Sequence, residues 1–147
     1  METLLSLWLI VCKGNTCRSP MFMVLLQDAL RKKGLGQVTV ESAGILAEAA
    51  GQPAAPESVE CMSRLGLDLR PHVSRFVGSL DINAYDKIVC MEPEVLKAIV
   101  ALRPKGEVSL ANEREGGIPN PWQQGQFAYD ICALTIQRVV KEMVQAL

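Results

Sequence analysis

The order of residues near the N-terminus strongly restricts what this chain can fold into. Residues 4–11 are almost all apolar, which is typical of a central parallel strand covered on both faces. A short loop, residues 12–20, comes next, and residues 21–33 have the apolar spacing of a helix, with Pro20 near its first position. Backbone N–H groups converge at such a junction, and the helix dipole favours negative charge there. The order therefore predicts an anion-binding site.

The loop also carries reactive side chains. It begins with the thiol of Cys12, and Arg18 follows six residues later. A thiol is a strong nucleophile only as a thiolate, and a helix N-terminus together with a guanidinium stabilises that anion. The planar fork of Arg18 suits two oxygens of a phosphoryl group. Ser19 can stabilise the thiolate as a leaving group, and Gly14 and Asn15 suit the unusual φ angles of a tight loop.

Residues 11–20 resemble the signature of low-molecular-weight protein tyrosine phosphatases. The spacing Cys-x5-Arg-Ser is that of cysteine-dependent phosphatases, and the inner Gly-Asn and the final Cys-Arg-Ser-Pro point to this family. The resemblance implies that Cys12 attacks phosphorus, that Arg18 holds the phosphoryl oxygens, and that a phosphocysteine intermediate is then hydrolysed. It also implies that phosphate is bound by Lys13, Gly14, Asn15, Thr16, Cys17, Arg18 and Ser19.

Strand and helix patterns alternate along the rest of the chain. Further strands are predicted at residues 38–42, 87–91 and 107–110, and further helices at 56–65, 93–102 and 127–147, with a short helix or turn at 80–84. This order predicts an α/β fold of three layers, in which a four-stranded parallel sheet has helices on both faces. The resemblance implies the flavodoxin-like fold of the family. The 147 residues contain no linker, so we expect a single domain, residues 1–147.

Composition and charge exclude several classes of function. The formal net charge is -1, which argues against a nucleic-acid partner held by a broad basic surface. The five cysteines include no pair of zinc-binding spacing, so we expect no metal, no cofactor and reduced thiols in the cytoplasm. The apolar N-terminal run follows Glu2 and is too short for a membrane span, so neither a signal peptide nor membrane insertion is expected. We expect a monomer.

The resemblance covers nearly the whole chain. It continues through Ser42-Ala43-Gly44, through Gly66-Leu67-Asp68-Leu69 with His72 and Arg75, and through Val89-Cys90-Met91-Glu92. It implies that Asn15, Ser19, Ser42 and His72 form a hydrogen-bond network behind the phosphate loop. Such a network would hold the loop in shape before phosphate binds. His72 is the one histidine of the chain. The alternatives to its role in this network are a solvated position in a loop and a direct catalytic role.

The cysteine next to Arg18 has two interpretations. The resemblance implies that Cys17 forms a reversible disulfide with Cys12 under oxidant, which protects the nucleophile from irreversible oxidation. The alternative is a small buried hydrophobic side chain. Cys61, Cys90 and Cys132 are most simply core residues.

The late loop departs from the family pattern at Asn120. The family has an Asp-Pro pair there, and its aspartate protonates the leaving group, whereas this chain has Asn120-Pro121. An amide has no ionisable proton, and general acid–base catalysis typically contributes about 10²–10⁴-fold. We therefore expect either slow turnover or a weakened phosphatase that binds phosphorylated partners. Glu113, Glu115 and Asp130 are alternative acids, although a solvated acidic loop suits their positions better.

Thr16 bears on the choice of substrate. The tyrosine-specific members typically have Ile or Leu at this position, and threonine resembles the protein-arginine phosphatases of the same fold. The segment after Gly44 contains Leu46 but no aromatic residue, so Leu46 and Trp122 are the expected walls of the substrate pocket. The expected partner is a phosphorylated protein that carries phosphotyrosine, with phosphoarginine as the alternative.

Overall fold

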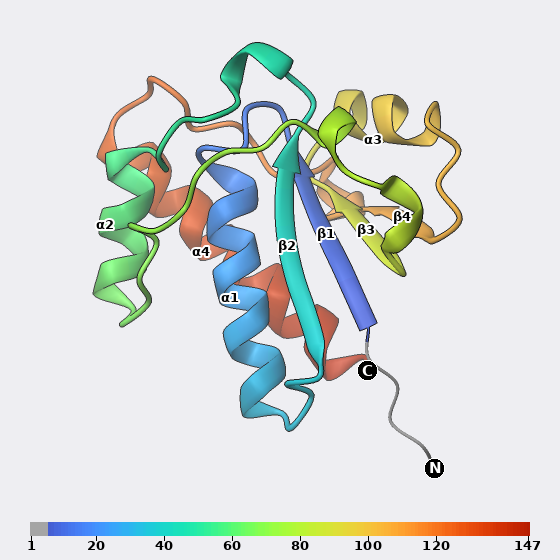
Figure 1. Ribbon diagram of the computed structural model, residues 1–147. Coiled ribbons are helices and arrows are strands. Elements are labelled where there is room, and N and C mark those ends of the chain that lie inside the picture. Colours follow the sequence, from blue (N-terminus) through green and yellow to red (C-terminus); the bar gives the residue numbers. More distant parts are fainter. Residues whose placement is uncertain (1–5) are drawn as a thin grey trace.

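Four parallel strands form the centre of the molecule, and their carboxyl ends point upwards in Figure 1. The computed structural model describes residues 6–147, so Leu4 and Leu5 of the first predicted strand lie outside the described residues. The strands lie in the order β2-β1-β3-β4. They are β1 (Ser6–Cys12), β2 (Val38–Gly44), β3 (Lys87–Cys90) and β4 (Glu107–Leu110). The predicted four-stranded parallel sheet is confirmed.

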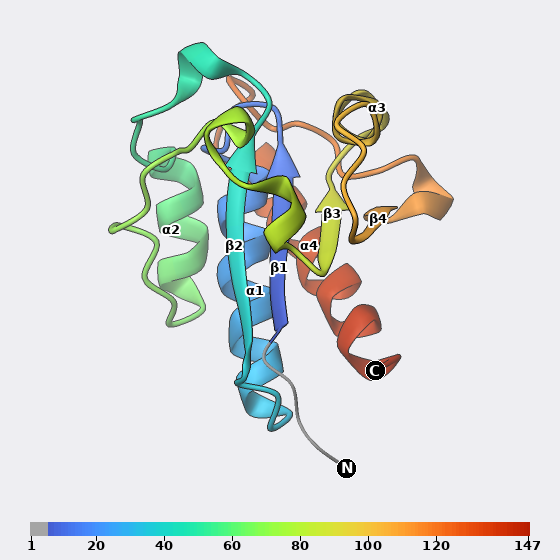
Figure 2. The ribbon, with the colours of Figure 1, turned by 45° about the vertical axis from the view of Figure 1, so that its right-hand side comes forward.

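Four α-helices cover the two faces of the sheet (Figures 1 and 2). They are α1 (Arg18–Lys32), α2 (Pro56–Arg64), α3 (Pro93–Val100) and α4 (Gln126–Gln145). Helices α1, α2 and α4 pack on one face with Trp8 and Ile10 of β1, and α3 packs on the other with Leu9 and Val11. Because side chains alternate along a strand, β1 contributes to both cores. The three predicted layers are confirmed.

The helix after β1 begins earlier than the sequence pattern indicated. It starts at Arg18 rather than Met21, so Pro20 occupies its first turn, where the missing N–H has no helical acceptor to lose. The loop between β1 and α1 is therefore only five residues long, residues 13–17. Arg18 and Ser19 consequently belong to the helix and are held rigidly. Within residues 6–147, none of the helices combines the length and the apolar character needed to cross a membrane.

The end of β2 packs directly against this loop. Gly44 lies beneath it, and a Cβ atom added there would stand 2.6 Å from the Lys13 carbonyl oxygen. Any other residue would push the loop away, so glycine is required at this position. The Ile45 N–H donates to the Lys13 carbonyl at 2.9 Å, and the Leu46 N–H donates to the same oxygen at 3.1 Å. The first two strands thus fix the loop in place.

Candidate active site

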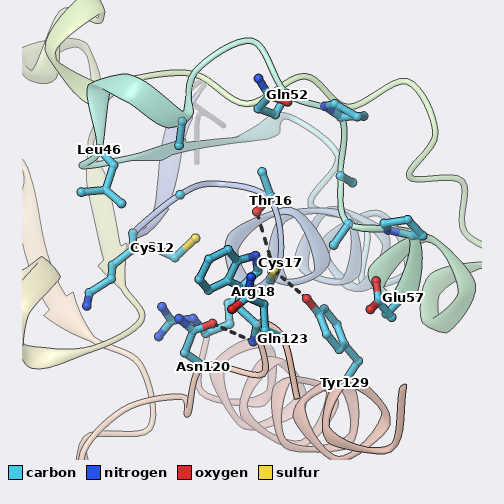
Figure 3. Close-up of a pocket in the computed structure, with 18 residues that line it drawn as sticks. Cys12, Thr16, Cys17, Arg18, Leu46, Gln52, Glu57, Asn120, Gln123 and Tyr129 are labelled. Atoms are coloured by element: carbon cyan, nitrogen blue, oxygen red, sulfur yellow. Dashed lines mark hydrogen bonds between the residues drawn. The ribbon is translucent and has the colours of Figure 1, made fainter. Parts of the chain in front are cut away.

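A cavity of about 720 Å³ opens at the carboxyl ends of the first strands. Its walls come from the loop after β1, from residues 46–57 and from residues 120–129 (Figure 3). Parallel sheets bind ligands at this end of the strands. Of the residues predicted to bind phosphate or substrate, the lining includes Cys12, Lys13, Gly14, Thr16, Cys17, Arg18, Leu46, Asn120 and Trp122.

Two hydrogen-bonding groups contact the sulfur of Cys12. The Asn15 backbone N–H donates to Sγ at 3.2 Å, and the Ser19 Oγ lies 3.0 Å from Sγ. Cys12 ends β1 and is only 2% exposed. Hydrogen bonds to a thiolate stabilise the charged form, both in the resting site and when the sulfur departs as a leaving group. This geometry suits a nucleophilic cysteine.

The guanidinium of Arg18 lies almost entirely inside the protein. Its Nη1 donates to the Ile118 carbonyl at 2.9 Å and pairs with a carboxylate oxygen of Glu92. Its Nε is the one buried side-chain nitrogen or oxygen in the described part of the chain without a protein partner. Buried donors without an acceptor are rare. Because Arg18 lines the cavity, an anionic oxygen bound there suits this unused donor.

Asn15 joins the loop after β1 to Ser42 of β2 and to Arg75. Its backbone is left-handed, with φ of 59°, and its side chain is fully buried. The Nδ2 group donates to Ser19 Oγ at 2.8 Å and to Ser42 Oγ at 2.9 Å, while Oδ1 accepts from the Arg75 N–H at 2.9 Å. Asn15 and Ser19 therefore lie behind the loop, where their side chains hold its shape.

The histidine completes this network. Nε2 of His72 lies 2.7 Å from the Asn15 carbonyl oxygen, and because a carbonyl only accepts, Nε2 carries the proton. Burial lowers the pKa of His72, and the nearby charge of Arg75 lowers it further, against the opposing effect of the hydrogen bond. Neutral His72 contacts the back of the loop and does not line the cavity. The implied network of Asn15, Ser19, Ser42 and His72 is present in the geometry.

Glu92 was missed as a site residue by the sequence reasoning. It follows β3, the neighbour of β1, and its carboxylate lies between Arg18 and Lys13. Lys13 also contacts Glu94 at 3.0 Å, and this hydrogen bond raises the pKa of Lys13. Residues that follow adjacent parallel strands meet at one edge of the sheet, but the sequence does not show which strands are adjacent.

The second cysteine of the loop is held by a tyrosine that sequence reasoning did not single out. The Tyr129 hydroxyl on α4 lies 3.2 Å from Cys17 Sγ, and Thr16 Oγ1 lies 3.6 Å from the same sulfur (Figure 3). Burial raises the pKa of Cys17, and burial together with the Cys17 contact raises the pKa of Tyr129. Both groups are therefore protonated at neutral pH.

Asn120 lines the cavity together with Cys12 and Arg18 (Figure 3). Its Oδ1 accepts from the Trp122 N–H at 3.2 Å, which closes a short turn. Trp122 is 57% exposed and Leu46 38% exposed, so both side chains reach the rim as expected.

The alternative acids Glu113, Glu115 and Asp130 do not line the cavity. Glu115 pairs with Arg138, and Asp130 with Arg64. Within residues 6–147, no cluster of three or more His, Cys, Asp or Glu side chains could hold a metal ion.

A cysteine at the end of a parallel strand, with a loop N–H donated to its sulfur and a buried arginine in the same cavity, defines the class of cysteine-dependent phosphatases. The family model described as low molecular weight phosphotyrosine protein phosphatase matches residues 8–147, and the chain belongs to this family. The family resemblance predicted from residues 11–20 is therefore confirmed.

Relatives and solved structures agree with this assignment. The Acinetobacter johnsonii low molecular weight protein-tyrosine-phosphatase Ptp is 34% identical over 137 residues, which cover 91% of this chain and 92% of the relative. Vibrio vulnificus Wzb in complex with benzylphosphonate has a TM-score of 0.86 at 28% identity and covers 97% of this chain and 99% of its own. A mutant of YwlE arginine phosphatase with a phosphorylated active-site serine has a TM-score of 0.85 at 25% identity and covers 96% of this chain and 95% of its own.

Proposed function

We propose that this protein removes phosphate from phosphotyrosine in proteins through a phosphocysteine intermediate on Cys12. The observation that carries the proposal is the setting of this thiol. Cys12 Sγ receives the Asn15 N–H and lies 3.0 Å from Ser19 Oγ. Cys12 shares its cavity with Arg18, whose buried Nε has no hydrogen-bond partner among the described residues. Names of family relatives, such as the protein-tyrosine-phosphatase of Acinetobacter johnsonii, support phosphotyrosine as the substrate.

The reaction has two steps in this site. The thiolate of Cys12 attacks phosphorus, an S–P bond forms, and the tyrosyl P–O bond breaks with its electron pair going to the phenolic oxygen. Water then attacks the phosphocysteine, the S–P bond breaks, and the thiolate returns to its hydrogen bonds with Asn15 and Ser19. Both protons of the water leave with the phosphate, and the phenolate takes its proton from solvent. Arg18 and the loop N–H groups stabilise the phosphoryl oxygens in both steps.

We propose that turnover is slow. Asn120 lines the same cavity as Cys12, and its amide can neither give a proton to the phenolic oxygen nor take one from water. The loss of general acid–base catalysis costs about 10²–10⁴-fold in rate. Replacement of Asn120 by aspartate is therefore expected to raise the rate.

Phosphoarginine is the second candidate substrate. Thr16 lines the cavity beside the nucleophile, and the YwlE arginine phosphatase shares the fold at 25% identity. The amide of Asn120 argues against this substrate. Guanidine is a very strong base, because arginine loses its proton only at a pKa far above neutral pH, so guanidine departs poorly without an acid. Phosphotyrosine is therefore preferred.

Free thiols set the conditions under which this chemistry works. The five cysteines are all unpaired in the structure. A reactive thiol at position 12 requires a reducing environment, so we propose that the protein acts in the cytoplasm.

Phosphate release from phosphotyrosine and phosphoarginine peptides tests the proposal. We expect faster release from phosphotyrosine, complete loss in Cys12→Ser, and a gain of at least about tenfold in Asn120→Asp. Thr16→Ile serves as the specificity control and is expected to lower the phosphoarginine rate more than the phosphotyrosine rate. Tight binding of a phosphopeptide without release, in both the natural chain and Asn120→Asp, would instead identify a phosphate-binding module.

A further inference from the structure

The cavity offers no free carboxylate near the nucleophile. Glu57 of α2 is the one carboxylate among the lining residues, and Figure 3 shows it across the cavity from Cys12. Outside the cavity lining, the carboxylate of Glu92 pairs with Arg18 and lies 3.8 Å from Lys13 Nζ. Both carboxylate oxygens of Glu92 are engaged with these cations. The described part of the chain thus holds no acid in place to protonate a leaving group.

The other proton-bearing side chains around the thiol are poor acids. Burial raises the pKa of Cys17, and burial with the Cys17 contact raises the pKa of Tyr129. The hydrogen bond to Glu94 raises the pKa of Lys13. Neutral His72 is engaged with the Asn15 carbonyl on the far side of the loop. Proton transfer is efficient when the pKa of the acid lies near the working pH, and the raised pKa values of Cys17, Tyr129 and Lys13 move these groups away from it. His72 does not line the cavity.

Asn120 lines the cavity, and the N–H groups of its side-chain amide are free to donate hydrogen bonds. Its Oδ1 is used by the Trp122 N–H, and its Nδ2 group makes no hydrogen bond to any described residue. An amide N–H₂ can donate to an oxygen but cannot lose the proton at neutral pH. Asn120 can therefore stabilise a leaving oxygen that keeps its negative charge. It cannot help a leaving group that must be protonated.

We propose, on the basis of the function proposed above, that this site prefers phosphate compounds whose leaving group departs as a stable anion, acyl phosphates foremost. The Cys12 thiolate attacks phosphorus, the S–P bond forms, and the P–O bond breaks with its electron pair going to a carboxylate oxygen. No proton is needed in this step. The carboxylate accepts a hydrogen bond from Asn120, and water then hydrolyses the phosphocysteine, so that the products are a carboxylate and inorganic phosphate.

The basicity of the leaving group ranks the substrates. Carboxylic acids ionise at a pKa of about 4, phenols at about 10 and guanidinium above about 12. Without an acid, the rate of P–O or P–N cleavage falls as this pKa rises. The expected order is therefore acyl phosphate, then phosphotyrosine, then phosphoarginine. The same phosphocysteine forms from every substrate. Acyl phosphates form it quickly, so for them the hydrolysis of the phosphocysteine limits kcat.

Benzoyl phosphate and phenyl phosphate provide a test with substrates of similar aromatic shape. Steady-state release of inorganic phosphate is measured for both, with spontaneous hydrolysis and the Cys12→Ser rate subtracted. We expect kcat/KM for benzoyl phosphate to exceed that for phenyl phosphate by at least about 100-fold. We expect Asn120→Asp to narrow this ratio to less than about tenfold, because aspartate can protonate the phenolic oxygen.

The outcomes separate the two proposals. Equal rates for the two substrates, with a ratio that Asn120→Asp leaves unchanged, would overturn the preference while the phosphatase function stands. A large fall in the phenyl phosphate rate alone in Glu57→Gln would identify Glu57 as an acid and would also overturn it. Release from neither substrate would overturn the phosphatase function itself.

Acyl phosphates occur both as small metabolites and as phosphoaspartate in proteins. The same assay with acetyl phosphate and with a protein that carries a phosphoaspartate distinguishes these sources. Faster turnover of either one than of phenyl phosphate supports the proposal, and the ratio between the two identifies the source. Turnover of both below the phenyl phosphate rate would overturn it.

Discussion

The side-chain amide of Asn15 donates a hydrogen bond to the hydroxyl of Ser42 at 2.9 Å, and this contact joins the loop after β1 to the end of β2. The same amide holds Ser19, whose hydroxyl lies 3.0 Å from the nucleophilic sulfur of Cys12. One buried side chain therefore supports both the shape of the loop and the stability of the thiolate.

Replacement of Asn15 by alanine tests this support. The variant leaves two buried hydroxyls without their donor and places alanine at φ of 59°. We expect the free energy of unfolding to fall by about 2–4 kcal/mol, measured by urea denaturation, with kcat reduced as well. Asn112 has a similar φ of 55° and lies outside the cavity. Asn112→Ala is expected to lower stability and to spare kcat, and equal kcat losses would contradict the proposed support.

The pairing of Glu92 with Arg18 predicts an effect on substrate binding. The Arg18 side chain is 2% exposed, so Glu92 compensates a charge that has little contact with water. We expect Glu92→Gln to lower kcat/KM by about tenfold or more, because the guanidinium loses its fixed position. Glu94→Gln is the matched control, since Glu94 is 65% exposed and contacts only Lys13. Its kcat/KM is expected to change by less than about twofold, and equal effects of the two changes would disprove the role of Glu92.

His72 predicts a dependence of stability on pH. Its pKa in the folded protein lies below the unfolded value of 6.5. Its contribution is therefore complete above pH 6.5 and is lost as the pH falls through the lowered folded-state value. We expect unfolding free energy to decrease on acidification in this range and the decrease to shrink in His72→Gln. NMR titration of the single imidazole measures its pKa directly, and a value above 6.5 would contradict the account.

Cys17 predicts reversible inactivation by peroxide. Oxidised Cys12 is expected to condense with Cys17 to a disulfide, so that dithiothreitol restores activity. In Cys17→Ala the oxidation proceeds further, and we expect little recovery under the same treatment. Cys90 is buried on the opposite face of the sheet and provides the control, because Cys90→Ala should recover like the natural chain. Full recovery of Cys17→Ala would show that Cys17 does not protect the nucleophile.

The order of strands and helices was predictable because its signals are local. Residues 6–12 form a buried strand as their apolar pattern indicates, and the alternation of strand and helix specifies the parallel sheet. The start of α1 was not, because the pattern of apolar residues begins only after Arg18 and Ser19. Arg18 and Ser19 form the first turn of α1, where their position depends on the preceding loop and not on the apolar pattern of the helix.

Contacts between distant segments were less predictable. Glu92 meets Arg18 across 74 residues of sequence, and Tyr129 meets Cys17 across 112. Such pairs depend on which strands are neighbours and on how α4 packs, and no local pattern encodes either. The positions of Asn15, Ser42 and His72 were anticipated only because the family resemblance supplied the network.

The central claim is that Cys12 carries the phosphoryl group during turnover. Rapid acid quench of the reaction with a phosphotyrosine peptide, followed by mass spectrometry of the intact protein and of its peptides, tests this claim directly. The account predicts one added phosphoryl group, mapped to Cys12 and absent in Cys12→Ala. Release of phosphate at an undiminished rate by Cys12→Ala, or a phosphoryl group mapped to another residue, would contradict it.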